Sequence, residues 1–159
     1  MPVSQEQFRL ALSRFASGVT VVTVASGEEL HGMTASAFAS VSLDPPRVLV
    51  CLDKGSRTRA LLADQSTFAI SILSADQEDV SRKFADTGPK PFGELIHKRG
   101  ENGAPLLDGA IAWIECSVSE IIDGGDHDIV LGEVTACTPS DGAPLLYFDR
   151  TYRSLSNES

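Results

Sequence analysis

Residues 54–59, Lys-Gly-Ser-Arg-Thr-Arg, have the types and spacing of an anion-binding turn. The segment follows a predicted strand, turns at Gly55 and opens a predicted helix, which Ser56 is well suited to cap. Hydroxyls, cations and the free N–H groups of a helix N-terminus all bind phosphate. Three of the chain's 13 Lys and Arg residues lie in these six positions. This favours a phosphate site over the alternative of an ordinary capped helix with solvated basic residues.

A second candidate is the stretch of residues 31–46, which is small and hydroxyl-rich and ends in Asp-Pro-Pro. A core strand would carry more Val, Ile, Leu and aromatic residues. Small side chains would let a flat ligand come close to backbone N–H and C=O groups. A loop with one weak strand is the alternative for the same composition.

The third candidate is His127, which follows Gly124-Gly125-Asp126 and begins a predicted strand. On local evidence a lone histidine at a hairpin is a plain polar residue more often than a catalytic one. The histidines have no spacing typical of a metal site, and no CxxC is present. The sequence also lacks a Rossmann glycine motif, a P-loop and a nucleophile elbow. It therefore predicts no metal site, and nothing in it points to a nucleophile triad.

The elements that must position these residues are mostly strands. Residues 110–122 alternate most clearly, as in a half-buried antiparallel strand. Ser4 and Gln7 predict a capping box at the start of the first helix, and Gly18 predicts its end. Ser74 or Asp76 is the predicted N-cap of the third helix. Short turns and the lack of alternating long helices favour an antiparallel barrel with helical additions. Six strands are expected at residues 19–25, 47–53, 67–73, 110–122, 127–138 and 145–148, and a hairpin return through Leu30 and His31 into residues 31–46 brings the expected number to about seven. The expected helices are residues 4–17, 58–64 and 77–84.

Composition narrows the class of protein. The chain has 159 residues, which is one ordinary domain, and a formal net charge of −9. That charge argues against nucleic-acid and anionic-membrane binding, although a local pocket can still bind a small anion. Three cysteines without close spacing fit a reducing compartment. No signal peptide or run of 18 apolar residues is visible, so we expect a cytoplasmic protein with no membrane partner.

Taken together, these segments resemble the flavin reductase family, the FMN-binding split-barrel group that includes reductase components of two-component flavin monooxygenases. The resemblance runs in order over nearly the whole chain. Its most specific part is the combination of S-x-S-L-D-P-P, G-D-H-x-I and L-L-Y. The matching segments are residues 8–9, 18–23, 32–38, 40–46, 50–52, 56 and 58, 84–85, 125–127 with 129, 132 and 134, 144–147 and 152.

The resemblance implies a mainly β fold, a six-stranded antiparallel Greek-key split β-barrel with short peripheral helices that forms a homodimer. It implies one flavin reductase-like domain over residues 1–159, with an ordered core of about 5–155. The implied activity is hydride transfer from NADH or NADPH to FMN or FAD, with reduced flavin supplied to a partner monooxygenase. Such chemistry belongs to the cofactors and demands no separate acid–base pair. The alternatives are a non-enzymatic flavin-binding or electron-transfer protein and a partner-binding barrel with an empty pocket.

The resemblance also assigns site residues. Phe84 falls near the flavin, and His127 lies by the nicotinamide as a positioning or hydrogen-bonding residue. One departure is Phe148-Asp149-Arg150-Thr151-Tyr152, where the family commonly has an Arg-Gly-like pair, so Arg150 and Tyr152 receive no role. The implied flavin-ring residues are Thr34, Ala35, Ser36, Ser40, Val41 and Ser42, and the implied ribityl and phosphate residues are Cys51, Leu52, Asp53, Ser56, Arg57 and Thr58.

Overall fold

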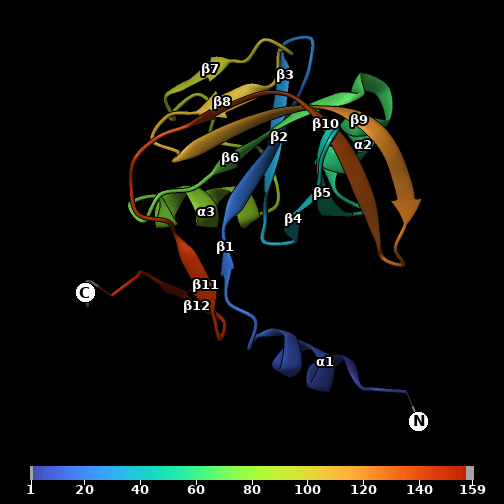
Figure 1. The fold of residues 1–159 in the computed structure, drawn as a ribbon, viewed down its shortest axis with the longest axis vertical. Helices are drawn as coiled ribbons and strands as arrows, with labels where there is room; N and C mark the ends of the chain where they lie inside the picture. Colours follow the sequence, from blue (N-terminus) through green and yellow to red (C-terminus); the bar gives the residue numbers. More distant parts are fainter. Residues whose placement is uncertain (1, 157–159) are drawn as a thin grey trace.

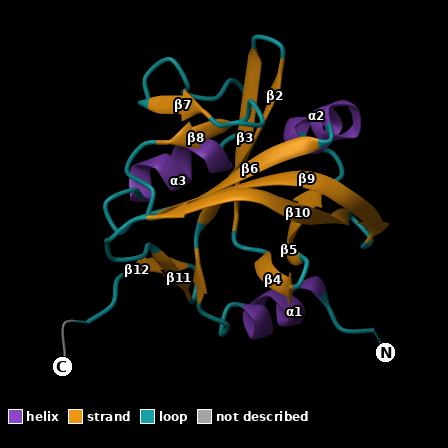
Figure 2. Ribbon diagram, turned by 45° about the horizontal axis from the view of Figure 1, so that its top comes forward, coloured by secondary structure: helices purple, strands orange, loops and turns teal. Residues whose placement is uncertain are grey.

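Antiparallel strands form the body of the molecule, and three short helices lie around them (Figure 1, Figure 2). The structure is a computed structural model that describes residues 2–156; the two ends of the expected domain, residue 1 and residues 157–159, lie outside the described residues. The helices are α1 (Gln5–Leu12), α2 (Arg57–Gln65) and α3 (Glu78–Ala85). The strands are β1 (Ser17–Gly18), β2 (Thr20–Ser26), β3 (Glu29–Ala35), β4 (Phe38–Leu43), β5 (Pro46–Asp53), β6 (Thr67–Ile72), β7 (His97–Arg99), β8 (Pro105–Leu107), β9 (Ala112–Asp123), β10 (His127–Pro139), β11 (Leu146–Phe148) and β12 (Thr151–Arg153).

The largest sheet has seven strands in the order β3-β2-β6-β9-β10-β5-β4, and all its pairings are antiparallel. The β-branched strand β2 is buried on both faces, as its composition predicts. Val22 and Val24 pack in a core that includes Leu61 and Leu62 of α2. Val21, on the opposite face of β2, packs in a second core with residues that include Phe84 of α3. The two helices therefore cover opposite faces of one central strand.

The sheet must curl, because its two edge strands are neighbours in the chain. Only Ser36 and Ala37 separate β3 from β4. Seven flat strands would measure about 29 Å across, at about 4.8 Å between neighbours. The chain from Ala35 to Phe38 spans at most about 11 Å. The edges consequently approach each other where β3 passes into β4, although no ladder joins these two strands within residues 2–156.

Several expectations about the elements are confirmed and some are wrong. All six expected strands occur, as β2, β5, β6, β9, β10 and β11, to within two residues at their ends. Residues 31–46, which could have been a loop, contain most of β3 and all of β4. The six-stranded barrel that the resemblance implies is not confirmed, because the main sheet has seven strands. The short strands β1, β7, β8 and β12 had no sequence signal because two or three residues are too few to show a period.

Some of the expected helix caps and ends are confirmed, and others are wrong. Ser4 and Gln7 form the predicted capping box, and Ser56 accepts a hydrogen bond from the backbone N–H of Arg59 at 3.1 Å. The first helix ends at Leu12, so the expected end at Gly18 is wrong: Gly18 lies in β1, paired with Leu146 of β11. Neither Ser74 nor Asp76 caps α3. Gln77 occupies that position and makes no side-chain cap hydrogen bond.

Helix α1 stands apart from the body of the molecule (Figure 1) and has no buried residue. Phe8 is 57% exposed and Leu12 56%, while Phe15, just after the helix, is 80% exposed. On edge strand β4, Val41 is 47% and Leu43 92% exposed. These five side chains form an apolar surface without a partner in the described chain. None of the described helices has the length and apolar character needed to cross a membrane.

Candidate active site

Residues of β3, of the segment just after it and of β5 line three grooves of the molecule. Thr34 and Ser36 on one side, with Cys51 and Asp53 on the other, are among the lining residues. The residues between them face the opposite way, because successive side chains of a strand alternate. Ala35 is 7% exposed and Leu52 is fully buried, and both belong to the main core. Ala35 and Leu52 can therefore offer a ligand their backbone groups, while their side chains fill the core.

The first groove has a volume of about 570 Å³ and lies between β3, the turn before α2 and the segment after α3. We call it the anion groove. The structure brings six of the predicted flavin residues together here, although they come from three separate parts of the chain. These residues are Thr34, Asp53, Ser56, Arg57, Thr58 and Phe84.

Hydrogen bonds hold the turn at the mouth of the anion groove. The Asp53 carboxylate accepts from the Gly55 N–H at 2.7 Å. The Ser56 hydroxyl donates to the Asp53 carbonyl at 2.8 Å and also caps α2. A short side chain that bonds backbone two residues on is typical of tight turns. The predicted strand–turn–helix arrangement is thus confirmed, and it places the N-terminus of α2 at the groove.

The three cations of residues 54–59 already have carboxylate partners. Arg57 donates two hydrogen bonds to Glu29, at 2.9 and 2.8 Å, which lower the pKa of Glu29. Arg59 donates to the buried Asp128 at 2.7 Å. Lys54 pairs with Asp123, whose hydrogen bond raises the pKa of Lys54.

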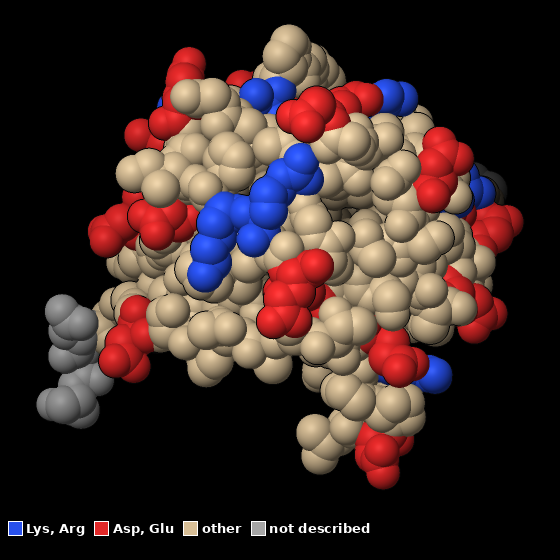
Figure 3. Space-filling view, turned by 90° about the horizontal axis from the view of Figure 1, so that it is seen from above, with Lys and Arg blue, Asp and Glu red and all other residues tan. Residues whose placement is uncertain are grey.

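Of these three cations, only Arg57 lines the anion groove. The view from above shows Lys and Arg side chains in a band, with Asp and Glu side chains around it (Figure 3). The segment therefore carries less free positive charge than its composition predicts.

Two further basic residues line the anion groove and had not been singled out from the sequence. His31 Nδ1 lies 3.0 Å from the hydroxyl of Thr58. Burial lowers the pKa of His31, and the nearby charge of Lys90 lowers it further. Lys90 donates to the carbonyls of Phe84 (3.1 Å) and Asp86, and burial lowers its pKa. Lys90 stands between two prolines in a segment without periodicity, so only the folded chain reveals its place.

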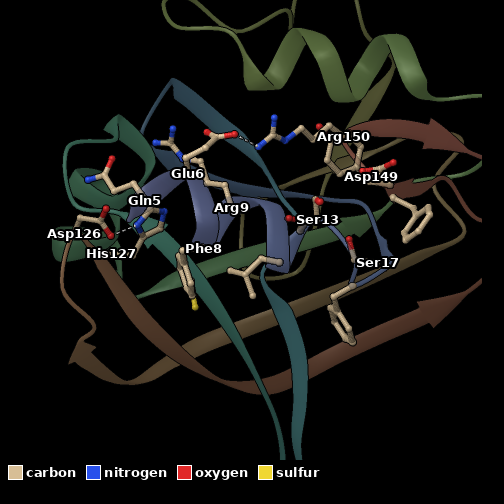
Figure 4. A pocket seen from close by; sticks show the side chains of 16 residues that line it. Gln5, Glu6, Phe8, Arg9, Ser13, Ser17, Asp126, His127, Asp149 and Arg150 are labelled. Carbon is tan, nitrogen blue, oxygen red and sulfur yellow. Dashed lines mark hydrogen bonds and ion pairs between the residues drawn. The ribbon is translucent and has the colours of Figure 1, made fainter. Parts of the chain in front are cut away.

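The second groove lies beside α1, with a volume of about 870 Å³ (Figure 4). We call it the α1 groove. It contains His127 at the start of β10, beside Ser36 and Cys51. His127 Nδ1 lies 2.8 Å from Asp126, and this hydrogen bond lowers the pKa of the Asp126 carboxyl. The pairing of β10 with β5 sets His127 opposite Asp53. The predicted nicotinamide residue and the predicted phosphate turn are therefore neighbours on the sheet.

A smaller groove of about 290 Å³ joins the other two, and we call it the bridging groove. It shares Thr34 with the anion groove and Ser36 with the α1 groove. Tyr152 lines it and is held by a 2.7 Å hydrogen bond to Ser81, whose carbonyl accepts from Thr34 at 2.6 Å. Arg150 lines it as well as the α1 groove. Arg150 and Tyr152, to which the sequence assigned no role, therefore both line the bridging groove.

The remaining predicted flavin residues lie elsewhere. Ser40, Val41 and Ser42 belong to the edge strand β4 and line none of these three grooves of the described chain. The small size of Gly32 has a structural cause. A Cβ there would lie 3.1 Å from the Phe84 ring and 3.0 Å from the Val22 carbonyl oxygen. At this position the small residue accommodates the chain's own aromatic ring.

The three grooves share lining residues, with His31 and Lys90 at one end and His127 at the other. Residues 12–156 match a family model described as flavin reductase like domain. The chain belongs to this family.

Relatives of known name cover almost the whole chain. An NADH-dependent flavin reductase of Rhodococcus sp is 42% identical over 156 residues, which cover 96% of this chain and 88% of the relative. The reductase component of a flavin-dependent trigonelline monooxygenase of Acinetobacter baylyi is 41% identical over 154 residues, covering 96% of this chain and 50% of its own length. The solved structure of the Streptomyces globisporus C-1027 NADH:FAD oxidoreductase SgcE6 in complex with NAD and FAD fragments matches with a TM-score of 0.93 and 40% identity, covering 100% of this chain and 99% of that one.

Proposed function

We propose that this chain is an NAD(P)H-dependent flavin reductase that transfers a hydride from NADH or NADPH to FMN or FAD. The observation that carries the proposal is the joining of the anion groove and the α1 groove at Thr34 and Ser36. Two flat cofactors in contiguous grooves can meet face to face, which is what direct hydride transfer requires. The NADH-dependent flavin reductase from Rhodococcus supports the same activity.

The donors in the anion groove fit the phosphate end of a flavin nucleotide. Ser56 and Thr58 supply hydroxyls at the N-terminus of α2, and Lys90 and His31 supply groups that carry or gain positive charge. Bound flavin supplies the hydride acceptor. The protein holds and orients it and keeps water from the reacting faces. The proposed flavin residues are Thr34, Ser36, Cys51, Asp53, Ser56, Arg57, Thr58 and Phe84, with Ala35 and Leu52 through their backbones; Ser40, Val41 and Ser42 are left out because they lie on β4.

His127 is proposed to position the nicotinamide in the α1 groove. Its hydrogen bond to Asp126 engages Nδ1 and fixes the ring, which leaves Nε2 to meet a ligand. An exposed histidine held by a carboxylate can orient a carboxamide by hydrogen bonding. No proton transfer by His127 is needed for the hydride step.

Further parts of the proposal concern fold, assembly and location. We propose that β2, β3, β5, β6, β9 and β10 form the six-stranded Greek-key split barrel within one domain over residues 1–159. All six strands contribute buried side chains to the main core, whereas β4 contributes none. The exposed apolar surface of α1, Phe15 and β4 supports a homodimer. The free cysteines of the chain support a cytoplasmic location. The Acinetobacter reductase component supports a monooxygenase as recipient of the reduced flavin.

The activity is tested by following NADH and NADPH oxidation with FMN, FAD or riboflavin added to the purified protein. We expect flavin-dependent oxidation, and bleaching of the bound flavin's visible spectrum when NADH is added without oxygen. A yellow protein that does not oxidise either nucleotide would instead be a flavin-binding or electron-transfer protein. Light scattering on the wild type and Leu43→Arg tests the dimer, since a charge at this exposed position should leave only monomer.

A further inference from the structure

The hydroxyl proton of Thr34 is already committed to a hydrogen bond within the protein. Thr34 lies on β3 and donates to the backbone carbonyl of Ser81 on α3 at 2.6 Å. A carbonyl oxygen only accepts hydrogen bonds, so the proton between these two oxygens is that of Thr34. Turning it elsewhere would leave two acceptor oxygens facing each other at this distance, which is costly. The Thr34 hydroxyl can therefore only accept a hydrogen bond from a ligand.

Ser81 is held in place from a second side. The residue is fully buried, and its hydroxyl lies 2.7 Å from the hydroxyl of Tyr152 on β12. One residue of α3 thus joins β3 to β12. These bonds lie within one chain and do not depend on a second copy of it. The direction of the Thr34 hydroxyl is consequently set before any ligand binds.

Thr34 also marks the place where the anion groove meets the bridging groove, because it lines both. With the flavin phosphate in the anion groove, the flavin ring extends toward this meeting point, where a nicotinamide in the α1 groove can reach it. The atom of the ring that receives the hydride, N5, belongs at the same place. Hydride transfer breaks the C4–H bond of the dihydronicotinamide and forms an N5–H bond with its electron pair. The nicotinamide is thereby oxidised, and the flavin is reduced to its N1 anion.

The N5 atom of a flavin changes its hydrogen-bonding character in this reaction. In oxidised flavin it has a lone pair and no hydrogen, so it gains nothing from an acceptor. In reduced flavin it is an N–H donor. We propose that the Thr34 hydroxyl accepts a hydrogen bond from N5–H of reduced flavin, so that the site favours reduced over oxidised flavin. This inference rests on the function proposed above. A group shifts an equilibrium only by its difference in affinity for the two states, and Thr34 supplies such a difference.

Thr34→Val tests the inference because valine has nearly the same shape and lacks the oxygen. Thr34→Ser keeps the hydroxyl. Thr23→Val is a matched control, since Thr23 is buried on β2 and donates to the carbonyl of Pro105, also at 2.6 Å. Thr23 lines none of the three grooves of the described chain, so this control loses a comparable hydrogen bond away from the site.

The experiment measures the dissociation constants of oxidised FMN and, without oxygen, of chemically reduced FMN, together with the midpoint potential of the bound flavin against a reference dye. In Thr34→Val we expect reduced FMN to bind about tenfold more weakly, the loss of one hydrogen bond, and oxidised FMN to keep its wild-type affinity. The midpoint potential should then fall by about 30 mV, the equivalent of a tenfold change in a two-electron equilibrium. Thr34→Ala removes the same oxygen and should give the same shift. Thr34→Ser and Thr23→Val should keep the wild-type potential.

An unchanged midpoint potential in Thr34→Val and Thr34→Ala would overturn the inference while leaving the reductase activity in place. Equal weakening of both forms of FMN would also overturn it, since Thr34 would then bind a group that is present in both redox states. Wild-type protein that oxidises neither NADH nor NADPH in the presence of flavin would refute the proposed function itself, and the two failures are therefore distinguishable.

Discussion

Lys90 offers the sharpest test of where the flavin phosphate binds. The ammonium group lines the anion groove, is held by the carbonyls of Phe84 and Asp86, and has no carboxylate partner within the described chain. Arg57, in the same groove, is bonded twice to Glu29. A phosphate in the anion groove should therefore gain more from Lys90 than from Arg57.

The magnitude follows from the interaction that Lys90→Gln removes. A hydrogen bond to a charged group contributes about 1.5–3 kcal/mol, and 1.4 kcal/mol corresponds to a tenfold change in affinity. FMN should bind about 10- to 100-fold more weakly to Lys90→Gln. Riboflavin, which has the same ring and ribityl chain without the phosphate, should bind with wild-type affinity. Arg57→Gln should weaken FMN binding less than Lys90→Gln.

Titration of flavin fluorescence with wild type and the two variants measures these affinities. Burial lowers the pKa of Lys90 in the free protein, so FMN affinity should fall as the pH rises through that pKa, and riboflavin affinity should not. Equal weakening of FMN and riboflavin by Lys90→Gln, or no weakening of FMN, would refute this placement of the phosphate.

The remaining predictions concern packing, pH and the nicotinamide end. Gly32→Ala should lower the free energy of unfolding by about 1–3 kcal/mol, because its Cβ would press on the Phe84 ring and on backbone; chemical denaturation measures this, and wild-type stability would contradict it. Burial lowers the pKa of His31 below its usual value of 6.5, so the folded state binds its proton less readily than the unfolded state. The stability of the protein should therefore fall as the pH drops below 6.5, and His31→Gln should flatten that slope in pH-dependent urea unfolding. His127→Ala should slow flavin reduction by NADH about tenfold or more in rapid mixing, the loss expected for one positioning contact, while FMN affinity stays unchanged. If weaker FMN binding fully accounts for the slower reduction, His127 acts on the flavin and the proposed role at the nicotinamide is wrong.

Local sequence signals predicted the elements well because each depends on residues close together in the chain. Ser56 predicts the start of α2, and the alternation of residues 110–122 predicts β9. Strand alternation also predicts the direction in which the side chains of two site residues point. Val48, Val50 and Leu52 share one parity of β5, which already assigns the side chain of Leu52 to the core and that of Cys51 to the other face.

Other features needed the folded chain because they join distant residues. Arg59 is bonded to Asp128, 69 positions away, and no local pattern reveals that its charge is neutralised there. The same holds for Lys90, which reaches the anion groove from a segment of turns. Whether a strand borders the grooves is also set by distant residues. The small, hydroxyl-rich stretch of residues 31–46 contributes to both β3 and β4, but of these two strands only β3 borders the joined grooves.

The pairing of His127 with Asp53 has a consequence for how the protein is made. These two residues are 74 positions apart, so almost half of the 159-residue chain must be synthesised after β5 before β10 can pair with it. Pairings of such long sequence separation form slowly, and an unpaired strand edge invites aggregation in the meantime. The surplus of 22 acidic over 13 basic residues makes nascent chains repel one another during that interval. Within the seven-stranded sheet, the ladders of β10 are the last to become available, and its ladder with β5 sets His127 beside the turn of the anion groove. A newly synthesised chain therefore completes this sheet and brings these two parts of the site together in the same late step.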